Sequence, residues 1–266
     1  MSKKGFVSLV GAGPGDVDLM TVKAVRLLQQ ADVVVYDRLV SADILDLIPS
    51  GVSRISVGKE VGKHCVPQDK INETIVSLAR TGRHVVRLKG GDPYMFGRGG
   101  EEALTLIKHQ IAFEIVPGIT AASGCSAYSG IPLTHRGMSR RVQFITGHFN
   151  DDEPLNLNWG SIADPDSTLV IYMGMANIDM ISRKLIEAGL DADIPAAAIE
   201  NGTKYQQRRV LTTLGKLALE AHAEKLQAPV IFVIGQVVSL ANQLDWFVTE
   251  EANGLSFTEK EKTSYG

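Results

Sequence analysis

The chain has 266 residues, of which 44% are hydrophobic and 21% charged, and this composition suits a soluble globular protein of one large or two smaller domains. Its formal net charge of −3 gives no general attraction to nucleic acid or to anionic membranes. Two cysteines are too few for a disulfide framework. The first strand begins almost at once, with no signal peptide before it. No apolar run approaches the ~20 residues that span a bilayer. We therefore expect a cytoplasmic protein that binds neither nucleic acid nor membrane.

Strands and helices alternate through the first half of the chain. Short apolar runs rich in β-branched residues predict strands at residues 5–10, 33–36, 54–57, 84–88 and 112–116. Amphipathic patterns predict helices at residues 18–30, 42–47, 68–80 and 101–109. Such alternation predicts a parallel sheet with right-handed crossovers.

Pro117 and Gly118 interrupt this alternation, and we place a domain boundary there. The prediction is an N-terminal α/β domain over residues 1–116 and a C-terminal α/β domain over residues 117–248. In the second domain, strands are predicted at 142–146, 168–173, 196–199, 210–213 and 230–234, with helices at 178–187 and 214–222. Little turn separates the third of these strands from the fourth, so part of this sheet should be antiparallel. Residues 249–266 are polar and aperiodic, which predicts a flexible tail.

The stretch from Lys89 to Glu102 follows a predicted strand, precedes a predicted helix and contains five glycines. Glycine permits positive φ and lets a ligand approach the backbone, and such strand-to-helix loops serve ligands in open α/β sheets. Asp92, Arg98 and Glu101 lie among these glycines, and a simple surface connection needs no such charges. We expect a ligand site here.

A second glycine-rich loop follows the first strand and resembles a dinucleotide-binding turn. Gly11 and Gly13 precede a helix, and Asp37 ends the next strand. However, the third glycine comes one residue early at Gly15, and Pro14 lacks the N–H that should contact a phosphate. The loop is a poor phosphate site, and a nicotinamide-dependent dehydrogenase is the less favoured alternative.

Other charged residues follow the predicted strands, at the edge where open α/β sheets bind ligands. Asp37 and Arg38 end the second strand, and Lys59 follows the third. A segment of small residues after Pro117 leads to a basic group that includes Arg136. The histidines are too scattered to form a metal site, and we predict no metal.

Nine sequence blocks, in order, resemble the tetrapyrrole methylase family from Gly11 to about Trp246. The blocks are Val10–Asp16, Val35–Val40, Val57–Lys59, Arg87–Pro93, Phe96–Glu102, Val116–Ser123, Gly130–Arg136, Tyr172–Gly174 and Glu200–Gly202. The block Gly130–Arg136 is similar to the uroporphyrinogen branch of the family. The resemblance implies two α/β domains with a cofactor cleft between them, usually in a homodimer.

The resemblance also implies an activity. Members of this branch transfer methyl groups from S-adenosylmethionine to C2 and C7 of uroporphyrinogen III, and the product, precorrin-2, leads to sirohaem, cobalamin or haem d1. Some relatives carry a fused dehydrogenase–ferrochelatase domain, but the match begins at the N-terminus, so we expect a monofunctional chain. A non-catalytic tetrapyrrole carrier is the alternative from another class of function.

The resemblance assigns roles to particular residues. It implies that Asp37 accepts a proton and Lys59 donates one, with Arg98 and Glu101 also implicated in proton transfer. Arg38, Arg98 and Arg136 are expected to bind substrate carboxylates, because a guanidinium fork matches a carboxylate. The implied cofactor contacts are Pro14, Gly90, Gly91, Asp92, Met95, Thr120, Ala121, Met173, Gly202 and Val230.

Overall fold

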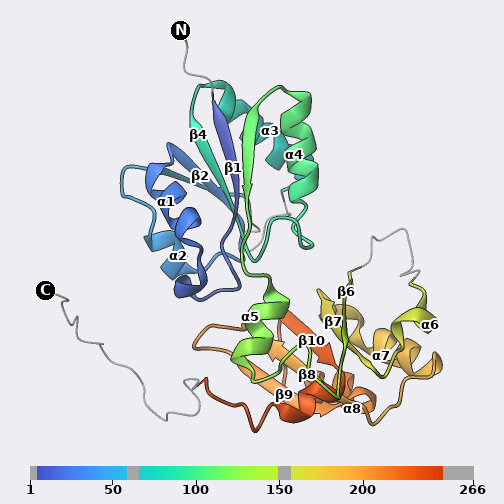
Figure 1. Ribbon diagram of the computed structural model, residues 1–266. Coiled ribbons are helices and arrows are strands. Elements are labelled where there is room, and N and C mark those ends of the chain that lie inside the picture. The colour runs from blue at the N-terminus through green and yellow to red at the C-terminus, as the bar shows by residue number, and fades with distance from the viewer. Residues whose placement is uncertain (1–4, 59–65, 149–156, 248–266) are drawn as a thin grey trace, which may run out of the picture.

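The computed structural model describes residues 5–58, 66–148 and 157–247, which form two five-stranded sheets in two lobes (Figure 1). The first sheet has the order β3-β2-β4-β1-β5, and every pair of neighbours is parallel. Its strands are β1 (Phe6–Gly11), β2 (Val33–Tyr36), β3 (Ser53–Ser56), β4 (His84–Lys89) and β5 (Ala112–Val116). The predicted parallel sheet is confirmed.

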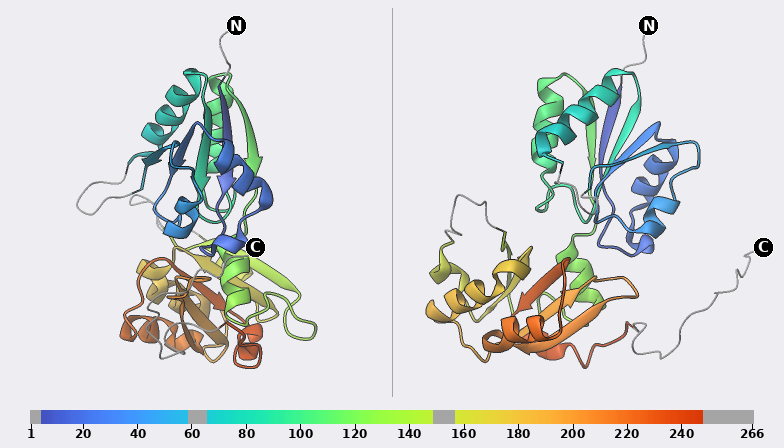
Figure 2. Two further views of the ribbon diagram at one scale, coloured as in Figure 1. Left: turned by 90° about the vertical axis from the view of Figure 1, so that its left-hand side faces the viewer. Right: turned by 180° about the vertical axis from the view of Figure 1, so that it is seen from behind.

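Helices cover both faces of the first sheet (Figures 1 and 2). They are α1 (Val22–Gln30), α2 (Ala42–Asp46), α3 (Gln68–Arg80) and α4 (Gly99–Lys108). Leu28 of α1 and Ile44 of α2 pack with Leu88 on one face, while Ile75 of α3 and Leu106 of α4 pack on the other. The side chains of β4 therefore alternate between two cores, as expected for a buried parallel strand.

The second sheet has the order β6-β7-β10-β8-β9. Its strands are β6 (Arg141–Thr146), β7 (Ser167–Tyr172), β8 (Pro195–Glu200), β9 (Arg208–Thr213) and β10 (Val230–Ile234). Strands β6 and β7 are parallel, whereas β10 is antiparallel to both β7 and β8, and β8 is antiparallel to β9. The expectation of a partly antiparallel second sheet is confirmed.

The helices of the second lobe are α5 (Ala121–Tyr128), α6 (Trp159–Ile162), α7 (Ile178–Glu187) and α8 (Leu214–Ala223). Short 3-10 helices lie at Met175–Asn177 and Gln236–Leu240. Helices α7 and α8 pack on one face of the sheet around Phe232, and α5 packs on the other face near Val233. Helix α5 lies at the junction of the two lobes in all three views (Figures 1 and 2).

One predicted helix is wrong in its extent. Residues 18–30 do not form a continuous helix, because a 3-10 turn at Val17–Leu19 ends before α1 begins at Val22. The Asp16 carboxylate accepts the N–H of Asp18, and the Thr21 hydroxyl accepts the N–H of Ala24 at 3.1 Å. These side-chain caps start two separate elements where hydrophobic spacing alone indicates one.

Two expectations concern residues that the structure does not describe. The tail 249–266 and Lys59 lie outside the described residues. Within the described part of the chain, every helix is too short or too polar to cross a membrane.

Candidate functional site

Three loops meet at the carboxyl edge of the first sheet. Gly13 and Gly91 form an isolated antiparallel bridge, in which the Gly13 N–H donates to the Gly91 carbonyl at 3.1 Å and the reverse bond measures 2.7 Å. Gly11 lies so close to Gly118 that a Cβ on Gly11 would come within 2.6 Å of the Gly118 nitrogen. The loops after β1, β4 and β5 are thus joined through glycine backbone.

The Asp92 carboxylate fastens two of these loops. One of its oxygens accepts the N–H of Gly118 at 3.0 Å, and the other accepts the N–H of Tyr94 at 2.8 Å. Met95 follows and packs against the core beneath α5. The predicted cofactor residues Gly90–Asp92 and Met95 therefore lie on a loop whose course is fixed from both sides.

Tyr172, at the end of β7, connects this region with the second lobe. Its hydroxyl accepts the N–H of Ala122 at 3.0 Å and lies 2.6 Å from the Thr120 hydroxyl oxygen. Burial raises the pKa of Tyr172, so the phenol stays protonated, and either hydroxyl can be the donor in its hydrogen bond with Thr120. The predicted cofactor residues Thr120 and Ala121 thus begin α5 beside Met173, which is 49% exposed with φ +54°.

The first loop packs against α5 and the turn after β8. A Cβ on Gly124 would overlap the Pro14 ring, and one on Gly202 would overlap the Cys125 thiol. The Asp16 N–H donates to the Thr203 hydroxyl at 3.1 Å. Pro14 and Gly202 therefore both pack closely against α5, at the adjacent residues Gly124 and Cys125.

Val230 is the predicted cofactor residue that the structure separates from the others. Its side chain is 7% exposed and belongs to the core under α7 and α8, on the opposite face of the second sheet from α5. Only its backbone is available on the α5 side. A surface hollow of ≈ 470 Å³ between α7 and α8 also contains none of the predicted site residues.

The side-chain position of Gly91 is open at this junction. This glycine is half-buried with φ +67°, and a Cβ on it would meet nothing nearer than the Ala121 nitrogen at 3.9 Å. At the start of α5 the Ala122 N–H donates to Tyr172 and the Ser123 N–H to the Thr120 carbonyl, so the Ala121 N–H is the backbone donor nearest to this position. An open glycine position beside a backbone donor is compatible with the close approach of a polar cofactor.

Strained backbone gathers around the same junction. Seven non-glycine residues in the described part of the chain have φ between 50° and 70°. Five of them lie here, Phe96, Arg98, Met173, Asn201 and Thr203, while Gln110 and Lys225 follow α4 and α8. Each costs of order 1–3 kcal/mol, and such residues cluster at ligand sites.

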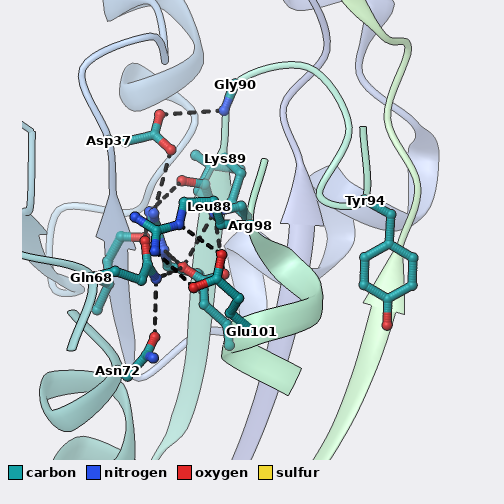
Figure 3. Close-up of polar contacts among 12 residues, drawn as sticks. Asp37, Gln68, Asn72, Leu88, Lys89, Gly90, Tyr94, Arg98 and Glu101 are labelled. Carbon is teal, nitrogen blue, oxygen red and sulfur yellow. Dashed lines mark hydrogen bonds and ion pairs between the residues drawn. The ribbon is translucent and has the colours of Figure 1, made fainter. Parts of the chain in front are cut away.

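A buried group of charges lies beneath the predicted proton acceptor (Figure 3). The Asp37 carboxylate accepts the N–H of Gly90 at 3.3 Å and lies 3.4 Å from the Arg87 guanidinium. Arg87 donates to Glu102 at 3.0 Å, and Lys89 lies 3.2 Å from the same carboxylate. Burial, with the neighbouring Arg87, lowers the pKa of Lys89.

Arg98 and Glu101 form an exposed ion pair at the start of α4. The guanidinium donates to both carboxylate oxygens, at 2.8 and 2.7 Å. These hydrogen bonds raise the pKa of Arg98 and lower that of Glu101. Arg38 and Arg136 are also exposed, as a carboxylate-binding role requires.

The sequence matches the family of tetrapyrrole (corrin/porphyrin) methylases over residues 7–218. The chain belongs to this family. Among curated relatives, siroheme synthase of Stutzerimonas stutzeri is 51% identical over 250 residues, and siroheme synthase 1 of Aeromonas hydrophila is 53% identical over 253 residues. These alignments cover 94% and 95% of this chain but 54% of each relative, so the chain spans about half the length of the curated relatives it matches.

Solved structures of family members have the same fold. Uroporphyrin III C-methyltransferase from Thermus thermophilus is 39% identical with a TM-score of 0.75, and the match covers 88% of this chain and 99% of that one. A structure of that enzyme complexed with S-adenyl homocysteine is 37% identical, with a TM-score of 0.75 and coverage of 88% and 93%. The predicted tetrapyrrole methylase fold is confirmed.

The sequence analysis did not identify the buried residues that lie next to Asp37. Arg87 and Lys89 lie two residues apart in a strand that is otherwise apolar, so both face the same side of the sheet. This spacing of two cations in an apolar strand was the one feature of the sequence that could have indicated a buried charged group. Its meaning depends on β2 pairing with β4, which brings Asp37 beside a residue 50 positions away. Tyr172 was missed in the same way, because its partners begin α5 in another part of the chain.

Proposed function

We propose that the protein transfers methyl groups from S-adenosylmethionine to C2 and C7 of uroporphyrinogen III, through precorrin-1, to give precorrin-2. The observation that carries this proposal is the meeting of three glycine-rich loops beside the start of α5, in a fold shared with uroporphyrin III C-methyltransferase. The complex of that enzyme with S-adenyl homocysteine supports the same cofactor here. The siroheme synthase relatives support a place before sirohaem.

When bound, S-adenosylmethionine supplies a methyl group activated by a positively charged sulfur. In our proposal, the cofactor contacts are Pro14, Gly90, Gly91, Asp92, Met95, Thr120, Ala121, Met173 and Gly202, with backbone of Val230. The loop bridge at Gly13 and Gly91 and the Tyr172 hydroxyl keep these segments at fixed positions. Positioning is the main requirement, because a porphyrinogen pyrrole carbon is already nucleophilic, and alignment supplies on the order of 7–11 kcal/mol of a barrier.

The substrate carries eight carboxylates, whereas the protein has no overall positive charge. Arg38, Arg98 and Arg136 are exposed guanidinium groups that would bind some of these carboxylates. A proton must leave the ring after methylation, and Asp37 is the proposed acceptor, with Lys59 as a donor and Arg98 and Glu101 as further proton-transfer groups.

Incubation with uroporphyrinogen III and methyl-labelled S-adenosylmethionine tests the proposal. We expect two labelled methyl groups in the tetrapyrrole and release of S-adenosylhomocysteine. A tetrapyrrole that binds without gaining label would instead identify a carrier. Calorimetry separates the remaining alternative, since a dehydrogenase would bind NAD(P) and ignore S-adenosylhomocysteine.

The proposal includes a cytoplasmic homodimer, with domains at residues 1–116 and 117–248 in each copy. The family resemblance supports the dimer, and exposed Tyr205, Leu244 and Trp246 supply apolar surface for an interface. Light scattering should give twice the chain mass, and a stable monomer at micromolar concentration would contradict this part of the proposal.

A further inference from the structure

Strand alternation brings three charged side chains to one face of the first sheet. Asp37 follows β2, while Arg87 and Lys89 lie in the adjacent strand β4, all on the side covered by α3 and α4 (Figure 3). Arg87 is 2% exposed and Lys89 is 4% exposed. Two buried cations in one short strand are costly unless each has a partner.

Each nitrogen of the Arg87 guanidinium donates a hydrogen bond. Its Nε donates to Glu102 Oε1 at 3.0 Å, its Nη1 donates to the Leu88 carbonyl at 3.1 Å, and its Nη2 donates to Asp37 Oδ2 at 3.4 Å. Nη1 also donates to the Val35 carbonyl at 3.5 Å, and one orientation of the fork satisfies all four contacts. Arg87 is therefore a rigid support for the Asp37 carboxylate.

The anion that orients Arg87 is itself held from two elements. Glu102 in α4 is 1% exposed and accepts from Lys89 at 3.2 Å and from Gln68 in α3 at 3.2 Å. The other Asp37 oxygen accepts the Gly90 N–H at 3.3 Å, which ties it to the glycine-rich loop. The carboxylate is fixed at both oxygens, by the strand on one side and by the loop on the other.

Stability alone does not account for this arrangement. Buried ion networks are often no more stable than apolar residues of the same volume, and their best-supported use is to specify one geometry. Here the geometry being specified is that of Asp37, whose side chain is 28% exposed while its partners are buried. A partly exposed carboxylate that is held by buried charged residues can present one orientation to a ligand.

We propose that Arg87 is a positioning residue for Asp37, and that Glu102, held by Lys89 and Gln68, fixes the orientation of Arg87. The inference rests on the proposed methyltransferase function, in which Asp37 accepts the proton. Lysine in place of Arg87 keeps the charge but loses the fork that reaches Asp37 and Glu102 together.

A double-mutant cycle tests the inference with Arg87→Lys, Asp37→Asn and the double variant. We expect Arg87→Lys to lower kcat by roughly 10–100-fold, because small misplacements of a reacting group carry costs of that size. The KM for uroporphyrinogen III and the calorimetric Kd for S-adenosylhomocysteine should stay unchanged. In the Asp37→Asn background, Arg87→Lys should lower kcat no further, because Arg87 acts through the carboxylate.

Two further variants keep the test decisive if Arg87→Lys does not fold. Glu102→Gln keeps the side-chain shape and should repeat the non-additive loss of kcat, even if Arg87→Lys fails to fold. Glu187→Gln, in the exposed pair with Lys184 on α7, is the matched control and should retain wild-type kcat. Independent, multiplicative losses of kcat, or an equal loss of S-adenosylhomocysteine binding, would overturn the positioning role. Failure of the unaltered protein to methylate would instead overturn the proposed function itself.

Discussion

Tyr172 shows how one side chain supports several parts of the candidate site. Its hydroxyl bonds both Thr120 and the N–H of Ala122, while its ring lies 4.8 Å from that of Phe96 and 6.1 Å from that of Phe144. Met173, a proposed cofactor contact, follows it directly. Tyr172 thereby contacts the start of α5 through its hydroxyl and Phe96 of the glycine-rich loop through its ring.

Removal of the Tyr172 hydroxyl should weaken cofactor binding without unfolding the protein. Tyr172→Phe keeps the ring contacts but leaves Thr120 and the Ala122 N–H without this partner. The expected rise in Kd for S-adenosylhomocysteine is about 2–10-fold, which corresponds to a net hydrogen-bond contribution of about 0.5–1.5 kcal/mol. Calorimetry measures it, and an unchanged Kd would remove Tyr172 from the support of the site.

Arg136 provides a residue-scale test of substrate binding. Its exposed guanidinium is proposed to bind a carboxylate away from the reacting carbon, so its contact is the same in the ground state and in the transition state. Arg136→Ala should raise the KM for uroporphyrinogen III by about 10-fold or more, as expected for a charged hydrogen bond, and leave kcat unchanged. Steady-state kinetics decides this, and a fall in kcat at constant KM would place Arg136 in the chemistry instead.

At the scale of elements, close glycine contacts set the distance between the loops after β1, β4 and β5. A Cβ on Gly118 would overlap the Gly91 carbonyl and crowd Gly11. Gly100, in the first turn of α4, has nothing within 4 Å of the same position. These two glycines therefore form a matched pair, one in contact with two loops and one facing open space.

Alanine at the two positions should have opposite consequences. Gly118→Ala forces the loops apart and should destabilise the protein by about 1–3 kcal/mol, with a clear loss of S-adenosylhomocysteine affinity. Gly100→Ala should preserve affinity and stabilise α4 by up to about 1 kcal/mol. Thermal unfolding and calorimetry on both variants provide the check. Equal behaviour of the two would show that close approach of the loops is not required.

The elements were largely predictable from sequence, and the site only in part. Residues 68–80 and 112–116 have the predicted boundaries, because hydrophobic period and local propensity suffice for such segments. The break at Thr21 depends on one side-chain cap, which the hydrophobic spacing does not reveal. The contact of Asp37 with Arg87 depends on the order of strands, which no local pattern encodes. Long-range pairing is the information that sequence reasoning lacked.

The whole molecule consists of two lobes, and each has polar connections between its own elements. In the second lobe, Glu200 at the end of β8 supplies one of these. Its carboxylate accepts from Arg208 in β9 and from the Gln227 N–H before β10, each at 2.6 Å. Glu200 is 5% exposed, so these partners compensate for its burial.

The charge state of Glu200 should make the stability of this lobe dependent on pH. Burial by itself raises the pKa of Glu200, but the bonds from Arg208 and Gln227 outweigh it and lower that pKa below its ordinary value. A carboxylate with a lowered folded-state pKa contributes stability that is present above its unfolded pKa of about 4.3 and is lost as the pH falls through the folded value.

Glu200→Gln should therefore lower the free energy of unfolding by about 1–3 kcal/mol at pH 7, and that free energy should decline less steeply below pH 5 than in the wild type. Denaturant unfolding at pH 7, 5 and 3.5 measures both effects, with exposed Glu187→Gln as the control that changes little. A variant that declines as steeply with acid as the wild type would show that other carboxylates govern acid stability.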